Sequence, residues 1–149
     1  MIEFELSHTP DEADLQRVRD EVVAHGRALS KCGESEPLAV FARQEDWLVG
    51  GVIGRMELKR LFVGYIWVDE GWRQRGLFSG LLTRIEAAAQ RGGCIDAIVE
   101  SLIDDVAAMF RAKGYVTVGM IPDYVPGFTR HILLKEFGAD RTGHRVVRR

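Results

Sequence analysis

The stretch WVDEGWRQRGLFSGLL, from Trp67 to Leu82, changes character in its middle and decides the fold. It begins as the end of an apolar strand, passes through an acidic turn, and then places Arg73 and Arg75 directly before Gly76 and a helix-like segment. A helix that begins at the carboxyl end of a strand presents unpaired backbone N–H groups and the positive end of its dipole. The junction is therefore predicted to bind an anion such as a pyrophosphate, although a solvated helix start with two surface arginines is the alternative.

Strand and helix patterns alternate on both sides of this junction. Residues 61–68 are apolar on both faces, which predicts a central strand, and Leu77, Leu81, Ile85 and Ala89 then recur at helical spacing. In chain order the patterns predict strands at 2–6, 38–42, 47–54, 61–68, 94–101, 115–121 and 130–137, and helices at 10–29, 77–91 and 104–113. Predicted caps are Thr9 for the first helix and Asp104 or Asp105 for the third, and 122–127 is predicted to be a loop. This order indicates an α+β fold of three layers that contains one mixed sheet. The second helix is expected to connect a parallel pair of strands in that sheet.

Length and composition indicate a single globular domain. The 149 residues are 46% hydrophobic and 28% charged, which excludes disordered and fibrous classes. The sequence has neither an apolar run long enough to span a membrane nor a signal-peptide pattern at its start, so we expect a cytoplasmic protein without a membrane partner. Cys32 and Cys94 form no disulfide framework, and the histidines show no metal-ligand spacing, so no metal is expected.

The charge is unevenly distributed. Residues 141–149 carry four arginines and no acid, whereas the chain as a whole has a net charge of −2, so residues 1–140 are acidic. We therefore expect a domain over 1–140 and a basic tail over 141–149. The acidic domain favours a cationic small molecule over nucleic acid, and a nucleic-acid role rests on the tail alone. The oligomeric state stays open, a homodimer included.

Two segments resemble the GNAT superfamily of N-acetyltransferases, in its small single-domain bacterial branch. IWVDEGWRQRGLFSGLL matches the family pattern of an apolar strand, a turn, and [Arg/Gln]-x-x-Gly-x-[Gly/Ala] leading a helix; AMFRAKGYVTVG is similar to a later helix-to-strand segment. The resemblance implies a GNAT-like fold whose central parallel strands splay apart. It also implies transfer of an acetyl group from acetyl-CoA, as co-substrate, to the primary amine of a small molecule, or of a peptide or protein, by direct attack.

The resemblance assigns cofactor-binding residues along the junction. The backbone of Ile66, Trp67 and Val68 would hydrogen-bond the pantetheine amides in the manner of an added strand. The segment that would surround the pyrophosphate consists of Arg73, Gln74, Arg75, Gly76, Leu77, Phe78 and Ser79. Phe78 departs from the small residue usual in its position, which is compatible with binding if Phe78 already lies within the helix.

Catalytic residues are less clearly marked. Phe110 replaces the tyrosine that often protonates the leaving thiolate in this family, which leaves Tyr124, His131 or solvent as the acid. Glu100, at the end of a predicted strand, is the first candidate for the base, and Asp123 and Tyr124 are candidate substrate-side groups. The loss of the tyrosine also keeps open a non-catalytic module that binds or senses acyl-CoA.

Overall fold

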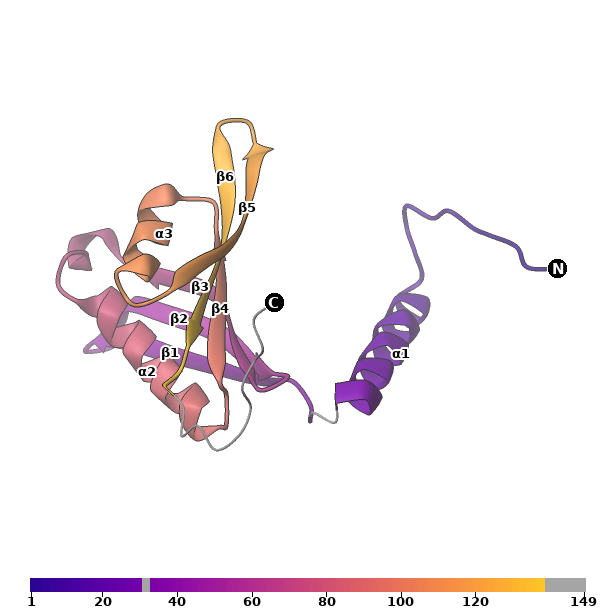
Figure 1. The fold of residues 1–149 in the computed structure, drawn as a ribbon, viewed down its shortest axis with the longest axis horizontal. Coiled ribbons are helices and arrows are strands. Elements are labelled where there is room, and N and C mark those ends of the chain that lie inside the picture. The colour runs from indigo at the N-terminus through magenta and orange to yellow at the C-terminus, as the bar shows by residue number, and fades with distance from the viewer. Residues whose placement is uncertain (31–32, 139–149) are drawn as a thin grey trace, which may run out of the picture. The chain divides into compact units, whose positions relative to one another are not determined.

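A computed structural model describes residues 1–30 and 33–138 of the chain (Figure 1). These residues belong to two compact units that divide between Glu34 and Ser35, and each unit is described by itself. The basic tail 141–149 and Cys32 lie outside the described residues. Across the two described ranges, no helix is both long enough and apolar enough to cross a membrane.

The first unit contains one helix, α1 (Glu12–Ser30), close to the predicted range. Asp11 caps it: its Oδ1 accepts a hydrogen bond from the Ala13 N–H at 2.9 Å. The predicted cap at Thr9 is wrong because the helix begins after the aspartate, which is the better capping residue of the two. Residues 1–7 contain no strand, so the strand predicted at 2–6 is also wrong. An alternating pattern identifies a face but does not supply the neighbouring strand that pairing requires.

Over its described residues, 35–138, the second unit forms a six-stranded sheet that carries two α-helices. Its strands are β1 (Glu36–Gln44), β2 (Trp47–Glu57), β3 (Arg60–Val68), β4 (Asp96–Ser101), β5 (Val116–Val125) and β6 (Phe128–Glu136), and its helices are α2 (Leu77–Arg91) and α3 (Asp104–Arg111). In the strand order β1-β2-β3-β4-β6-β5, the β3–β4 pair is parallel and the other pairs are antiparallel. The mixed sheet, with α2 connecting its parallel pair, confirms the predicted fold class.

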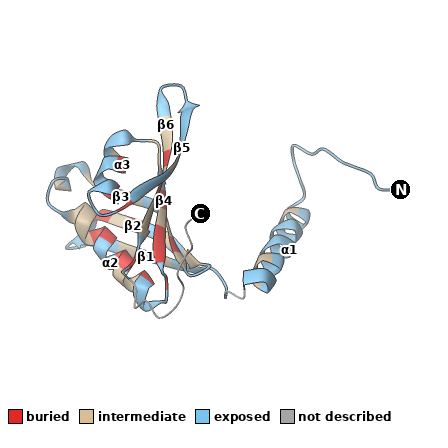
Figure 2. Ribbon diagram, viewed as in Figure 1, coloured by how far each residue is buried: buried red, intermediate tan, exposed pale blue. Residues whose placement is uncertain are grey.

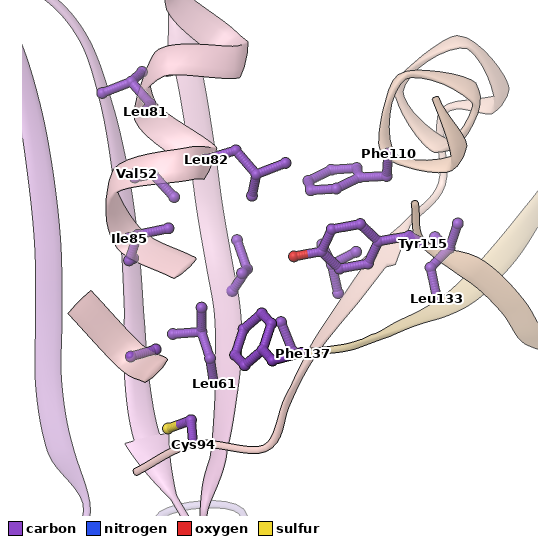
Figure 3. Packing of buried hydrophobic residues seen from close by; sticks show 14 of the residues in the cluster. Val52, Leu61, Leu81, Leu82, Ile85, Cys94, Phe110, Tyr115, Leu133 and Phe137 are labelled. Carbon is purple, nitrogen blue, oxygen red and sulfur yellow. The ribbon is translucent and has the colours of Figure 1, made fainter. Parts of the chain in front are cut away.

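The core lies between the sheet and the two helices of this unit. Figure 3 shows Leu82 and Ile85 of α2, Phe110 of α3 and Leu61 of β3 in one cluster, and each of these side chains is at most 1% exposed. Figure 2 shows the same distribution, with buried segments where α2, α3 and the strands meet. Burial of such side chains stabilises the fold by about 1.5–3 kcal/mol each. One face of the sheet is therefore covered by α2 and α3.

A buried polar cluster links α2 to the C-terminal strands. Glu86 of α2 accepts a hydrogen bond from the Tyr115 hydroxyl at 3.0 Å and one from Lys135 Nζ at 2.7 Å. Burial, followed by the neighbouring Glu86 carboxylate, raises the pKa of the Tyr115 hydroxyl well above its usual range. Because its pKa is raised, Tyr115 stays protonated at neutral pH, and its bond to Glu86 connects α2 to the segment before β5.

Two local predictions in the C-terminal half are wrong. The N-cap of α3 is Ile103, no side chain caps this helix, and the Asp104 carboxylate bonds to His131 instead. Strand β5 continues to Val125 through residues predicted to be a loop. A register shift between Ile121 and Val125 accommodates Pro122, which has no N–H to offer a sheet ladder.

Gly54 gives the fold a sharp stability test. A Cβ at this position would meet the backbone carbonyl oxygen of Phe62 closer than real Cβ atoms come, beside a register shift between β2 and β3. Gly54→Ala is therefore expected to lower the free energy of unfolding by about 1–3 kcal/mol, measured by urea denaturation. Gly64→Ala is the matched control, because its Cβ would approach the Ile53 oxygen only to 3.4 Å. Equal stability losses in the two variants would contradict the register described for β2 and β3.

Candidate active site

Strands β3 and β4 pair over only part of their length. Their parallel pairing ends at Val63 and Val99. Beyond these residues, β3 stays paired with β2 as far as Val68, and β4 stays paired with β6 as far as Ser101. Because each strand keeps its outer neighbour, the two strands diverge. The backbone groups of β3 that face β4 after Val63 have no strand partner there.

A cleft of about 580 Å³ opens where the strands diverge. It is lined by residues 63–67 of β3, by residues 99–103 at the end of β4, and by Val106, Phe110 and Arg130. Its volume is within the range of small-molecule and cofactor sites. Backbone of β3 thus borders a cavity, where an extended ligand can pair with it as an added strand.

The segment after β3 turns tightly before α2 begins. A short 3₁₀ helix, η1 (Glu70–Trp72), is followed by Gln74 with φ of 60° and Gly76 with φ of 81°. Gly76 is the N-cap of α2, and no side chain caps this helix. Its first backbone N–H groups are therefore available to a ligand, at the positive end of the helix dipole. This turn has the local geometry that the sequence predicts for an anion site.

The two arginines of the turn keep their charge unpaired. Arg73 Nε donates to the Val68 carbonyl oxygen at 3.3 Å, and the Arg75 guanidinium lies 5.0 Å from the centre of the Trp72 ring. Across residues 1–30 and 33–138, no carboxylate forms an ion pair with either arginine. Two cationic groups beside an uncapped helix start can therefore bind a phosphate-bearing ligand.

Phe110 closes one side of the cleft and carries no proton donor. Its ring is 1% exposed and makes edge-to-face contacts with Phe78 at 5.2 Å and with Tyr115 at 5.1 Å between ring centres. Phe78 lies in the first turn of α2. This is the position within the helix at which a large side chain is expected to be compatible with cofactor binding. Tyr115 lies beside Phe110 in the core (Figure 3). It does not replace the missing donor, because its hydroxyl is bonded to Glu86 and it does not line the cleft.

Glu100 lines the cleft together with Arg130, which sequence reasoning missed. Arg130 Nε donates to Glu100 Oε2 at 2.7 Å, and Arg130 Nη2 donates to the same oxygen. The guanidinium also lies 4.8 Å from the centre of the Tyr124 ring. Hydrogen bonding to Glu100 raises the pKa of Arg130, so this group is cationic throughout the accessible pH range. The alternation of β6 could have placed Arg130 on one face, but its pairing with Glu100 depends on the β4–β6 register.

The structure brings some predicted site residues together and leaves others apart. Ile66, Trp67 and Glu100 line the cleft. Val68 ends β3 and is followed, after η1, by residues 73–79, which form the end of the turn and the start of α2. Tyr124 does not line the cleft itself, but its ring contacts Arg130, which does. Asp123 does not line the cleft, and its Oδ1 accepts from the Gly127 N–H at 3.4 Å within the β5–β6 hairpin.

His131, the other candidate acid, is buried on the helix-covered side of β6. It is 9% exposed, its Nε2 lies 2.7 Å from Asp104 Oδ1, and its Nδ1 is buried without a hydrogen-bond partner among the described residues. It does not line the cleft. Its visible contact therefore anchors the first turn of α3, beside Ile103 and Val106 of the cleft wall.

Comparison with known proteins gives a consistent result. Residues 4–115 match the family model described as the acetyltransferase (GNAT) family. A blasticidin-S acetyltransferase of Streptomyces morookaense is 39% identical over 129 residues, which span 82% of this chain and 95% of that protein.

Solved structures show the same architecture. A crystal structure described as an acetyltransferase from Agrobacterium tumefaciens aligns with a TM-score of 0.82 and 25% identity, covering 91% of this chain and all of that one. An acetyltransferase from Bacillus cereus aligns with a TM-score of 0.81 and 23% identity, covering 89% of this chain and 98% of the other. The fold thus has solved counterparts.

Proposed function

The chain belongs to the acetyltransferase (GNAT) family and is an acetyltransferase, and from that premise we propose that it transfers the acetyl group of acetyl-CoA to the primary amine of a small molecule. The observation that carries this proposal is the divergence of β3 from β4 directly before an uncapped helix start. The exposed edge of β3 can bind the thioester-bearing arm of the cofactor, and the helix start can bind its pyrophosphate. The two binding surfaces are separate but adjacent.

Acetyl-CoA would bind along the strand and the turn. The free edge of β3 at Ile66, Trp67 and Val68 pairs with the amides of the pantetheine arm. The segment from Arg73 to Ser79 holds the pyrophosphate through backbone N–H groups and two guanidinium groups. Arg73 already donates to the Val68 carbonyl oxygen, so it ties the two surfaces together. No metal takes part in this proposal.

The acceptor amine would attack the thioester carbon directly. Its lone pair forms the new C–N bond, the carbonyl oxygen takes the negative charge and is stabilised by a backbone N–H near Val68, and the C–S bond then breaks. Glu100 receives the proton released by the amine, directly or through water. Coenzyme A leaves as a thiolate that solvent protonates, because Phe110 has no hydroxyl.

Two observations support a small-molecule acceptor: the volume of the cleft and the similarity to an acetyltransferase with a named small-molecule substrate. A cleft of about 580 Å³ suits a small molecule, and the blasticidin-S acetyltransferase named above is similar over most of this chain. A peptide or protein amine is the other acceptor that the family resemblance allows. The single domain over 1–140, the tail over 141–149 and the cytoplasmic location stay predictions.

Ligand-induced stabilisation and thiol release test the proposed function together. Acetyl-CoA at about 100 times its Kd is expected to stabilise the protein by about 2.7 kcal/mol, a rise in Tm on the order of 5–10 °C. Free thiol should then appear when a panel of small primary amines is added. Unchanged melting would contradict the cofactor site. A rise in Tm without thiol release for any amine would instead favour a sensing module.

A further inference from the structure

Two arginine–carboxylate pairs lie on the same face of the sheet and differ in how they bond. Arg60 binds Asp96 through both carboxylate oxygens, Nε to Oδ1 at 2.7 Å and Nη2 to Oδ2 at 2.9 Å, and the Asp96 side chain is only 7% exposed. Arg130 directs Nε and Nη2 at a single oxygen of Glu100, whose side chain is 43% exposed. The Arg60 pair is therefore closed, whereas the Arg130 pair retains bonding capacity on both partners.

The unused groups are Oε1 of Glu100 and Nη1 of Arg130. No hydrogen bond to either atom is present within residues 1–30 and 33–138. Both side chains line the cleft. The centre of the Tyr124 ring lies 4.8 Å from the guanidinium carbon, and, after the Glu100 carboxylate, the Tyr124 hydroxyl is a further neighbour that raises the pKa of Arg130. A carboxylate oxygen and a guanidinium edge are thus presented side by side to the cavity.

Their face of the sheet suits contact with the acceptor. Val99 and Leu133 are buried against α2 and α3, and side chains alternate along a strand, so Glu100 and Arg130 project from the opposite face. The uncapped start of α2, which holds the pyrophosphate in the proposed function, belongs to the helix-covered side. An amine that reaches the thioester from the face opposite α2 and α3 passes this pair.

Resting on the proposed acetyl transfer, we propose that the acceptor carries a carboxylate in addition to its reacting amine, and that Arg130 is the residue that selects it. Glu100 Oε1 accepts a hydrogen bond from the amine, and the free N–H groups of Arg130 bind the carboxylate of the same molecule. A purely cationic acceptor would leave Arg130 facing a second positive charge. This assignment differs from the preference for a cationic small molecule that the overall charge predicts.

Matched acid and amide ligands test this assignment. The probes are ω-amino acids of three to six carbons and the corresponding ω-amino amides, measured both for binding to the coenzyme A complex and for acetyl transfer. Wild type is expected to bind at least one acid about 10- to 100-fold more tightly than its amide. Arg130→Gln is expected to abolish that difference by weakening the acid alone.

Arg55→Gln is the control variant. Arg55 also pairs with a glutamate through one contact, Nε to Glu57 Oε2 at 3.0 Å, and lies 4.4 Å from the Phe62 ring centre, but it does not line the cleft. It should keep the acid preference, and both variants should keep the stabilisation by acetyl-CoA. Equal binding of acid and amide by wild type, no binding of any acid, or a preference retained in Arg130→Gln overturns the proposal. Absent transfer with intact acid-selective binding would instead overturn the proposed reaction alone.

Discussion

Replacing Arg73 and Arg75 together with alanine is expected to raise the Kd for acetyl-CoA by on the order of 100- to 10,000-fold. Each guanidinium contributes about 1.5–3 kcal/mol to a charged ligand when it is partly desolvated, and neither has a carboxylate partner within the described part of the chain to compete for it. Titration calorimetry at fixed ionic strength measures the change directly.

Two controls separate phosphate binding from loss of structure. Arg84 and Arg91 lie on α2 beyond its first turn, so replacing both with alanine removes the same charge and should leave the affinity within about threefold. Acetyl-pantetheine, which lacks the pyrophosphate, should bind wild type and the Arg73/Arg75 variant equally. If the variant loses both ligands to the same extent, the arginines act by holding Val68 and the strand edge rather than the phosphates.

Replacing Phe110 with alanine is expected to lower the free energy of unfolding by about 3–5 kcal/mol. The side chain is 1% exposed and contacts the rings of Phe78 and Tyr115, so its removal leaves a cavity between α2, α3 and Tyr115. Urea denaturation followed by circular dichroism measures the loss. The same variant should also bind acetyl-CoA more weakly, because Phe110 forms part of the cleft wall.

Met109→Ala is the matched control on the same helix. Met109 is 43% exposed, so its truncation should cost less than about 1 kcal/mol. A loss below about 1 kcal/mol for Phe110→Ala would mean that the neighbouring aromatic rings close the cavity, and would contradict the tight packing described for this cluster.

The central part of the fold could be predicted because its signals are local. The run before Val68 is apolar on both faces, the turn ends in a glycine, and the helix after Gly76 has a clear apolar stripe. The predictions of strand, turn and helix therefore agree with one another along the chain. The structure confirms β3, α2 and the parallel pair that joins them. The family resemblance added the divergence of the strands, which no periodicity could have shown.

Features that depend on distant partners were beyond this reasoning. Asp104 has a good capping residue type but bonds to His131, 27 residues away in the chain. Strand β5 continues past Pro122 because β6 is available to pair with Val125. No sequence pattern selects Arg130, because its role depends on its ion pair with Glu100 on a neighbouring strand. In each case the competing interaction lies outside the window that a sequence pattern covers.

The short parallel pairing of β3 and β4 has a consequence for the order of folding. The meander of β1, β2 and β3 and the β5–β6 hairpin are built from neighbours in the chain, and such contacts form early. The β3–β4 pairing joins residues 36 positions apart and the β4–β6 pairing joins residues 30 to 40 positions apart, so we expect these two long-range pairings to form in the last cooperative step. Cofactor binding should therefore appear only with the slowest refolding phase, and a proteolytic fragment with either half of the sheet should lack it.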